Sequence, residues 1–322
     1  MNILVTGGAG FIGANAVLNF ANKDHDVYVV DKNENSVNWR LFDKYENIYK
    51  HLLDARKLNW FVDAMGYDFD LIIHCAAQTA ATTSVSDPRQ DFTDNVLTGF
   101  EVAELARKMD AQVIYTSTNK VYGCKPNNLE TDELYTRYVF KNISGIDESF
   151  SIDQSGHTPY GISKLVTDLY LQEYHHVYGI KSTIFRMSCI YGDHQYGTED
   201  QGWVAWIIRN VLANGKINIY GNGKQVRDVL NVKDLVSLMN KVVDNKISGV
   251  FNVGGGKDNT LSLLELINIV NPDYDNIEFF DWRPMDQKVY ISDITKACKT
   301  FDWSPVITPE EGIKEMIKRF EK

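Results

Sequence analysis

Residues 6–13 read Thr6-Gly7-Gly8-Ala9-Gly10-Phe11-Ile12-Gly13, which is a G-x-x-G-x-x-G motif. A short apolar run, Ile3 to Thr6, leads into the motif, and an amphipathic stretch begins at Phe11. Glycines at such a strand-to-helix turn let the backbone approach a pyrophosphate, and the start of the helix supplies N–H donors and a favourable dipole. The motif therefore predicts a dinucleotide site formed by Gly7, Gly10, Phe11, Ile12 and Gly13. A tight glycine turn that binds nothing is the alternative.

Short apolar runs alternate with longer amphipathic stretches through the first half of the chain. Further strand-like runs are Val27 to Asp31, Leu71 to Ala76, Val113 to Ser117 and Ser182 to Met187. Helix-length stretches between them include Pro88 to Lys108 and Pro159 to Tyr178. This order predicts βαβ units, and runs that are apolar throughout predict parallel strands buried on both faces. The expected fold class is α/β, a Rossmann-type doubly wound parallel sheet.

The regular alternation fades after about Tyr191, where turns such as Tyr220-Gly221-Asn222-Gly223 separate shorter elements. The second part has too few strong strand signals for another complete doubly wound sheet. We therefore expect residues 1–190 to form the Rossmann domain, to which later segments can return. Residues 191–322 are expected to form a smaller C-terminal α/β lobe that binds the substrate.

Composition excludes several classes of function. The chain has 322 residues, with 33 Lys and Arg against 43 Asp and Glu, so its formal net charge is −10. An acidic chain without a basic block repels polyanions, so we expect neither a nucleic-acid nor a membrane partner. No secretion signal or long apolar run is present, which favours a cytoplasmic location. The four cysteines lack C-x-x-C spacing, which predicts reduced thiols and no metal site.

Asp31 ends the second apolar run, 18 residues after Gly13. This position is near the roughly 20-residue offset of a carboxylate that binds an adenosine ribose. Such a carboxylate accepts hydrogen bonds from the ribose hydroxyls and repels a 2′-phosphate, so the sequence favours NAD over NADP. Lys32, next in the chain, softens that preference. A solvated turn aspartate is the alternative.

Tyr160 and Lys164 lie four residues apart in Tyr160-Gly161-Ile162-Ser163-Lys164, so a helix places them on one face. An ammonium beside a phenol stabilises the phenolate and lowers its pKa from about 10. Thr118, which ends the strand-like stretch Thr116-Ser117-Thr118, can hydrogen-bond an oxygen that alternates between alcohol and ketone. The three residues predict proton exchange with a sugar hydroxyl. A surface Tyr/Lys pair is the alternative.

Together these motifs resemble the extended short-chain dehydrogenase/reductase family of nucleotide-sugar epimerases and dehydratases. The other stretches that carry the resemblance are His74-Cys75-Ala76-Ala77-Gln78, Val121-Tyr122-Gly123, Val226-Arg227-Asp228-Val229-Leu230 and Phe251-Asn252-Val253-Gly254-Gly255. The resemblance covers nearly the whole chain. It implies an enzyme that uses NAD, with Tyr160 as the acid/base, Lys164 on the nicotinamide ribose and Thr118 on the reacting oxygen.

The resemblance also implies further contacts with the cofactor. Beside the glycine loop, Tyr160 and Lys164, these are Asp31, Lys32, Asn33, Asp54, Ala55, Ala76, Ala77, Gln78, Asn95 and Thr116. Asp54 is expected to accept a hydrogen bond from the adenine amino group, with a helix N-cap aspartate as the alternative. Ala76 and Ala77 are small enough to let the cofactor pass, with ordinary apolar packing as the alternative.

Contacts with a nucleotide-sugar substrate are implied in the same way. They are Asn119, Lys120, His157, Cys189, Gln201, Trp203, Arg227 and Arg283. Arg227 and Arg283 are expected to bind the substrate diphosphate, because a guanidinium offers bidentate donors to phosphate oxygens. Salt bridges are the alternative for both arginines. Trp203 is expected to stack on the base or ribose, with a core position as the alternative.

The two residues after Thr118 narrow the reaction. In the family's 4,6-dehydratases these positions are Asp and Glu, which perform the acid and base steps of water elimination. Here they are Asn119 and Lys120. Because an amide cannot act as a general acid, dehydration is disfavoured and an epimerase is expected.

Other stretches resemble the branch of the family that epimerises CDP-activated hexoses at carbon 2. They include Asp200-Gln201-Gly202-Trp203-Val204 and Arg283-Pro284-Met285-Asp286-Gln287. A 4-epimerase that works through a 4-keto intermediate and a non-catalytic NAD-binding protein are the alternatives. The resemblance further implies a homodimer or homotetramer, with contacts around residues 88–108 and 159–178, and a place in polysaccharide biosynthesis.

Overall fold

The computed structural model describes residues 1–283 and 286–321, so Pro284 and Met285 of the quoted Arg283–Gln287 stretch lie outside the described residues. The chain divides into two compact units. The first comprises Met1–Thr118, Pro159–Arg186 and Val236–Phe251, and the second comprises Asn119–Thr158, Met187–Leu235 and Asn252–Lys322. The division is therefore more interleaved than a single boundary at residue 190. Residues 119–158 join the second unit, and residues 236–251 return to the first because they carry most of an edge strand of its sheet.

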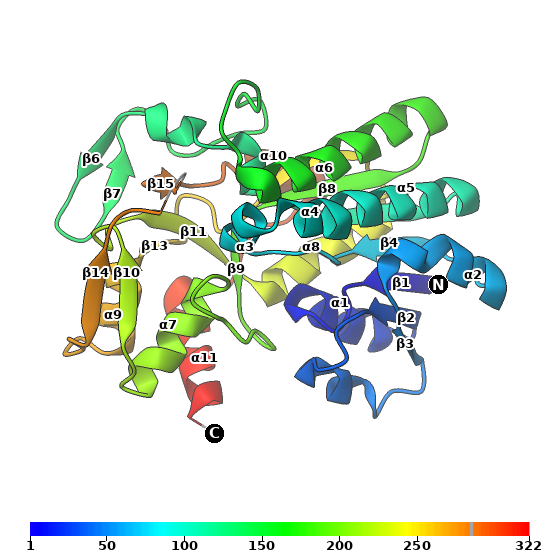
Figure 1. Ribbon diagram of the computed structural model, residues 1–322, viewed down its shortest axis with the longest axis horizontal. Helices are drawn as coiled ribbons and strands as arrows, with labels where there is room; N and C mark the ends of the chain where they lie inside the picture. Colours follow the sequence, from blue (N-terminus) through cyan, green and yellow to red (C-terminus); the bar gives the residue numbers. More distant parts are fainter. Residues whose placement is uncertain (284–285, 322) are drawn as a thin grey trace. The chain divides into compact units, whose positions relative to one another are not determined.

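The first unit is built on one sheet (Figure 1). Within the described ranges its seven strands lie in the order β12-β8-β5-β4-β1-β2-β3. They are β1 (Asn2–Thr6), β2 (Asp26–Asp31), β3 (Ile48–Leu52), β4 (Leu71–His74), β5 (Gln112–Thr118), β8 (Ser182–Met187) and β12 (Gly249–Val253). The pairings β3–β2, β2–β1, β1–β4 and β4–β5 are parallel. The predicted α/β doubly wound sheet is confirmed.

The order of the strands fixes where a ligand can bind. From β1 the chain adds β2 and β3 on one side and β4, β5, β8 and β12 on the other. The carboxyl end of β1 is therefore a topological switch point, where open α/β sheets bind ligands. All residues of β4, β5 and β8 are buried, which explains why these strands read as continuous apolar runs.

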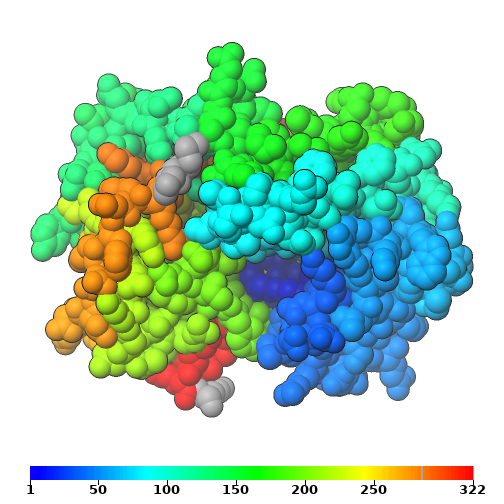
Figure 2. All heavy atoms as spheres, viewed as in Figure 1, coloured from blue at the N-terminus to red at the C-terminus, as the bar shows by residue number. Residues whose placement is uncertain are grey.

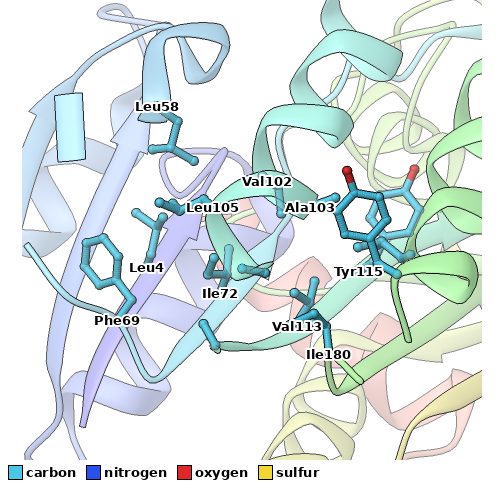
Figure 3. Packing of buried hydrophobic residues seen from close by; sticks show 14 of the residues in the cluster. Leu4, Leu58, Phe69, Ile72, Val102, Ala103, Leu105, Val113, Tyr115 and Ile180 are labelled. Atoms are coloured by element: carbon cyan, nitrogen blue, oxygen red, sulfur yellow. The ribbon is translucent and has the colours of Figure 1, made fainter. Parts of the chain in front are cut away.

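One core cluster of the first unit packs the sheet against three helices, α2 (Leu58–Met65), α5 (Thr98–Met109) and α6 (Thr158–Tyr178) (Figure 3). Leu4 and Ile72 come from the strands, and Leu58, Val102 and Leu105 come from the helices. Each of these side chains is at most 1% exposed. Full burial of such a side chain contributes about 1.5–3 kcal/mol, so this layer holds the strand ends in place.

Other helices of the first unit are α1 (Phe11–Ala21), α3 (Ala81–Ser86), α4 (Pro88–Phe92) and α8 (Val232–Asn245), and both α6 and α8 run across the unit boundary. Asn19 of α1 donates a hydrogen bond to Asn240 of α8 at 2.9 Å, so these helices lie side by side. Between α4 and α5 one π-helical turn covers Thr93–Leu97. Short 3-10 helices cover Val37–Phe42 and Ala55–Lys57.

The second unit has its own core and smaller sheets. Its strands are β6 (Thr131–Glu133), β7 (Tyr138–Phe140), β9 (Cys189–Tyr191), β10 (Ile217–Tyr220), β11 (Val226–Asn231), β13 (Thr260–Ser262), β14 (Ile277–Phe280) and β15 (Val289–Tyr290). Its helices are α7 (Trp203–Leu212), α9 (Leu263–Val270), α10 (Thr295–Phe301) and α11 (Pro309–Phe320), with 3-10 helices at Asn119–Tyr122 and Lys125–Asn128. Apolar residues of α7, α9 and α11 form one buried cluster. None of the helices, in the ranges described, has the length and apolar character that crossing a membrane requires.

Candidate active site

The glycine loop joins the end of β1 to the start of α1 at the switch point of the sheet. Gly7 has a φ of +66°, and a Cβ atom there would lie 2.6 Å from the backbone nitrogen of Ala76. A Cβ atom on Gly13 would collide with the carbonyl oxygen of Gly7. Both positions therefore require glycine. The first turn of α1, Phe11-Ile12-Gly13, is uncharged, so its dipole favours an anion at this end.

Part of the N-terminal segment is exposed at the surface of the first unit. In Figure 2 the dark-blue atoms of the N-terminal segment lie recessed beneath the cyan atoms of α3 and α4. Within the glycine loop Gly10 is exposed and Gly7 is half-buried, so a ligand can reach this turn.

Asp31 ends β2 beside the glycine loop. Its Oδ2 atom accepts a hydrogen bond from the backbone nitrogen of Ala9 at 3.1 Å, and its Oδ1 atom accepts one from that of Asn33 at 2.9 Å. Burial raises the pKa of Asp31, whereas these backbone donors lower it. The Lys32 ammonium lies 2.7 Å from Asp94. The Asp94 carboxylate therefore offsets the positive charge of Lys32, which was expected to weaken the preference for NAD over NADP.

Asp54 occupies the N-cap of the 3-10 helix Ala55–Lys57. Its carboxylate accepts a hydrogen bond from the backbone nitrogen of Arg56 at 3.0 Å and forms an ion pair with the Arg56 guanidinium. Hydrogen bonds from the Arg56 side chain are the main reason that the pKa of Asp54 is lowered to about 2. Ala55 is buried. The N-cap role, given above as the alternative for Asp54, is the one that the structure displays.

Asn95 fastens the loop after β4 to α6. Its Oδ1 atom accepts from the backbone nitrogen of Gln78 at 2.8 Å, and its Nδ2 atom lies 3.1 Å from the Gln78 carbonyl oxygen and 2.8 Å from the Ser163 hydroxyl. The π-helical turn that contains Asn95 is a feature found often at functional sites. Thr116 supports the same region, because its hydroxyl donates to the His74 carbonyl oxygen at 3.0 Å. Ala76 and Ala77 lie between these anchors, partly exposed.

Thr118 and Tyr160 meet within the first unit, and Lys164 follows Tyr160 by one helical turn. Thr118 ends β5, and Tyr160 and Lys164 stand one turn apart on α6. The side chains of Thr118 and Tyr160 share a hydrogen bond. Lys164 is buried, with its ammonium 4.4 Å from the centre of the Tyr115 ring. The backbone nitrogen of Tyr160 donates to the Ser84 hydroxyl at 3.0 Å, which fixes the start of the helix.

The ionisation of this group differs from the expectation in one respect. Burial raises the pKa of Tyr160 to about 12, and the hydrogen bond with Thr118 lowers it only in part. The pKa therefore lies above the ordinary value instead of below it, because removal of water penalises the phenolate more than its neighbours stabilise it. Burial also lowers the pKa of Lys164 to about 8, while Cys75, Asp168 and Asp91 act in the opposite direction.

In the second unit, Lys120 and Arg227 face the same carboxylate. The Arg227 guanidinium lies 2.7 Å from Asp286 Oδ1, and the Lys120 ammonium lies 3.9 Å from that oxygen. Burial lowers the pKa of Lys120, an effect that Asp286 opposes and Arg227 adds to. Cys189 adjoins this cluster and accepts a hydrogen bond from the Trp203 ring nitrogen at 3.2 Å. The structure thus brings two predicted substrate residues, Lys120 and Arg227, to Asp286, which the prediction had not singled out, and Cys189 and Trp203 adjoin this pair.

Arg283 belongs to a separate group of the second unit. It lies 3.1 Å from Asp200 and stacks 4.1 Å from the centre of the Tyr220 ring. Both predicted diphosphate arginines are therefore ion-paired, as the salt-bridge alternative allowed. His157 is buried, with its Nδ1 atom 3.4 Å from the Lys120 carbonyl oxygen, and Asn119 is buried too. Gln201 bridges to Thr198 and is exposed.

Two carboxylates beside Lys164 escaped prediction. Asp168 is fully buried and pairs with Arg186 at 3.0 Å. Its spacing of four residues after Lys164 on a helix was an available signal. Asp91 is also buried, but no local motif marks it. Its position depends on how α4 packs in the folded protein.

Comparisons with known proteins place the chain in a family. It matches the profile of the NAD dependent epimerase/dehydratase family over residues 3–254. It is 35% identical to CDP-paratose 2-epimerase of Salmonella typhi, over 98% of each chain, and 32% identical to a putative UDP-glucose 4-epimerase of Methanocaldococcus jannaschii, over 98% and 97%. Among solved structures, UDP-glucose 4-epimerase of Thermotoga maritima with UDP-glucose gives a TM-score of 0.83 at 27% identity, covering 100% and 99% of the two chains. The chain belongs to the NAD dependent epimerase/dehydratase family.

Proposed function

We propose that this chain is an NAD-dependent epimerase of a CDP-activated hexose of the paratose and tyvelose type, which it oxidises and re-reduces at carbon 2. The observation that carries the catalytic part is the hydrogen bond between Thr118 and Tyr160, with the buried Lys164 one turn further along α6. The choice of nucleotide and carbon is supported by the 35% identity to CDP-paratose 2-epimerase over 98% of each chain.

The glycine loop fits a dinucleotide. Its close contact with the end of β4 tolerates no Cβ atom at Gly7, and its helix begins with an uncharged turn. In the proposal the backbone N–H groups of that turn hold the pyrophosphate, Asp31 holds the adenosine ribose, and Tyr160 and Lys164 hold the nicotinamide ribose. NAD, when bound, supplies the acceptor and donor of the hydride.

The chain's own residues handle the proton. Tyr160 takes the proton of the sugar hydroxyl and later returns it to the ketone oxygen, and Thr118 hydrogen-bonds that oxygen in both states. Because burial holds the pKa of Tyr160 at about 12, its phenolate needs a cation nearby. Lys164, with a pKa of about 8, carries such a charge in most molecules at neutral pH.

Two features of the second unit support a nucleotide-sugar substrate that loses no water during the reaction. Asn119 and Lys120 stand where a dehydratase needs two carboxylates, so the proposal includes no water elimination. Lys120 and Arg227 together outnumber Asp286 by one positive charge, which suits them to a diphosphate. In the proposal the phosphate oxygens compete with Asp286 for Arg227.

A 4-epimerase is the second candidate. It is favoured by the 32% identity to a putative UDP-glucose 4-epimerase over 98% of this chain. Incubation with CDP-, UDP-, dTDP- and GDP-hexoses, followed by proton NMR of the products, separates the two. We expect inversion at carbon 2 of a CDP-hexose. Inversion at carbon 4 of a UDP-sugar would favour the second candidate, and no turnover of any sugar would contradict both.

A further inference from the structure

Asp168 is a fully buried carboxylate on α6, about two helical turns after Tyr160. The Arg186 guanidinium donates to it twice, from Nε to Oδ2 at 3.0 Å and from Nη2 to Oδ1 at 3.3 Å. The Ser117 hydroxyl donates to Oδ2 at 3.1 Å, and the Gln172 side-chain nitrogen donates to Oδ1 at 2.6 Å. One carboxylate thus binds three other side chains.

Two of these partners come from neighbouring strands of the sheet. Ser117 is the last residue but one of β5, and Arg186 is the last but one of β8, the strand next to β5. Both side chains are buried, and α6 and β8 lie side by side (Figure 1). Asp168 therefore joins α6 to the carboxyl ends of both strands, which is where open α/β sheets place their ligand sites.

Stability alone gives little reason for an ion pair buried this deeply. Removing the charges of Arg186 and Asp168 from water costs about as much as their attraction returns, so an apolar pair of similar volume is often as stable. A bidentate arginine–carboxylate pair, however, has a fixed geometry that apolar packing lacks. The Arg186–Asp168 pair therefore suits a role in setting the position of α6 on the sheet.

The contact of Ser117 with Asp168 lies next to the proposed catalytic group. Ser117 directly precedes Thr118, whose side chain shares a hydrogen bond with Tyr160 of α6. The donor–acceptor distance of such a bond varies by only about 0.5 Å, so the end of β5 and α6 must keep a fixed separation for it to form. The bond from Ser117 to Asp168 is a second link between the same two elements.

We propose that Ser117 and Asp168 are positioning residues that hold the end of β5 against α6, so that Thr118 and Tyr160 stay within hydrogen-bond distance. The inference rests on the proposed function, because the placement of Thr118 affects turnover only if Thr118 and Tyr160 act on the sugar. In this account neither Ser117 nor Asp168 touches the reacting sugar. Their effect reaches the reaction through Thr118.

The test compares Ser117→Ala with Gln172→Met. Each variant removes one hydrogen bond to the Asp168 carboxylate and leaves its pair with Arg186 in place, but only Ser117→Ala releases β5. One such bond is a small part of the stability of a domain, so both variants should fold. We expect kcat to fall by about 10–100-fold in Ser117→Ala and by less than about twofold in Gln172→Met, with NAD affinity unchanged in both.

A double-mutant cycle separates positioning from a general structural effect. Thr118→Ala already lacks the hydrogen bond with Tyr160, so adding Ser117→Ala to it should lower kcat by less than about twofold. If the fold-changes of the two substitutions multiply instead, Ser117 does not act through Thr118 and the proposal is overturned. Equal losses of kcat in Ser117→Ala and Gln172→Met, or a wild-type kcat in Ser117→Ala, would overturn it as well.

A second readout needs no substrate. Carbon-13 NMR of protein whose tyrosines are labelled at Cζ, with the Tyr160 signal assigned as the one lost in Tyr160→Phe, reports the hydrogen bond of this phenol. The signal should move in Ser117→Ala toward its position in Thr118→Ala, and stay in place in Gln172→Met. An unmoved signal in Ser117→Ala overturns the proposal. A wild type that turns over no nucleotide-sugar would contradict the proposed function, and this signal distinguishes the two failures.

Discussion

Tyr160 gives the sharpest prediction about a single residue. Its phenol shares a hydrogen bond with Thr118, and it is the proposed proton carrier. Tyr160→Phe removes only the hydroxyl, so kcat should fall by about 10²–10⁴-fold while NAD binding, followed by calorimetry, is retained. Tyr178→Phe on the same helix is the control, because Tyr178 is 53% exposed. Near-normal turnover of Tyr160→Phe would exclude the proposed mechanism.

Asp228 predicts a pH dependence of stability. It is fully buried on β11, and burial raises its pKa from the ordinary value to about 6, although the backbone nitrogen of Gly256 donates to it. Because the folded-state pKa of Asp228 is above its unfolded value, the contribution of this carboxyl to the free energy of unfolding is fully present below about pH 4. That contribution is lost as the pH rises through about 6. The loss amounts to about 3 kcal/mol at neutral pH.

Asp228→Asn removes this ionisation. The free energy of unfolding of the variant, measured by urea denaturation relative to the wild type, should therefore rise by about 3 kcal/mol from pH 4 to pH 7. Asp258→Asn, at an exposed position of the second unit, should show no such trend. A constant difference between Asp228→Asn and wild type across this range would contradict the prediction.

At the scale of elements, the turn from β1 to α1 requires glycine at Gly7, and this requirement can be tested. Gly7 and Gly66 both have a φ of +66°, but a Cβ atom would lie 2.6 Å from the backbone nitrogen of Ala76 at Gly7 and would meet nothing within 4 Å at Gly66. Alanine costs about 1–2 kcal/mol of backbone strain at either position. Gly7→Ala should in addition weaken NAD binding by about tenfold or more, because the loop must shift. Calorimetry of both variants checks this, and equal NAD affinities would contradict it.

Helices α5 and α6 present an apolar surface that suits the proposed homo-oligomer. Phe100 and Tyr170 are 41% and 46% exposed, and their rings meet edge to face at 5.9 Å. Phe100→Glu combined with Tyr170→Glu should lower the molecular mass measured by light scattering to that of a monomer. Trp60→Glu on α2, where Trp60 is 69% exposed, should leave the mass unchanged. A double variant with the wild-type mass would place the interface elsewhere or indicate a monomer.

At the scale of the whole molecule, local sequence signals predicted the sheet better than the assignment of segments to units. The glycine turn and the fully buried strands are determined by residues that are neighbours in the sequence, so both could be predicted from local patterns. The return of residues 236–251 to the first unit depends on pairing with distant strands, which leaves no local mark. The raised pKa of Tyr160 and the position of Asp91 likewise depend on burial by segments far away in the chain.

The net charge of −10 acts against both proposed ligands, which are anionic. The uncharged first turn of α1 in the first unit, and Lys120 with Arg227 in the second, are the local features that oppose it. Because these contacts are few, salt should weaken binding less steeply than it does for proteins that bind polyanions.

The central claim is oxidation and re-reduction at carbon 2 of a CDP-hexose. It is tested most directly by measuring turnover of substrate deuterated separately at carbon 2 and at carbon 4. We predict a primary isotope effect on turnover with deuterium at carbon 2 and none with deuterium at carbon 4. An isotope effect confined to carbon 4 would contradict the account.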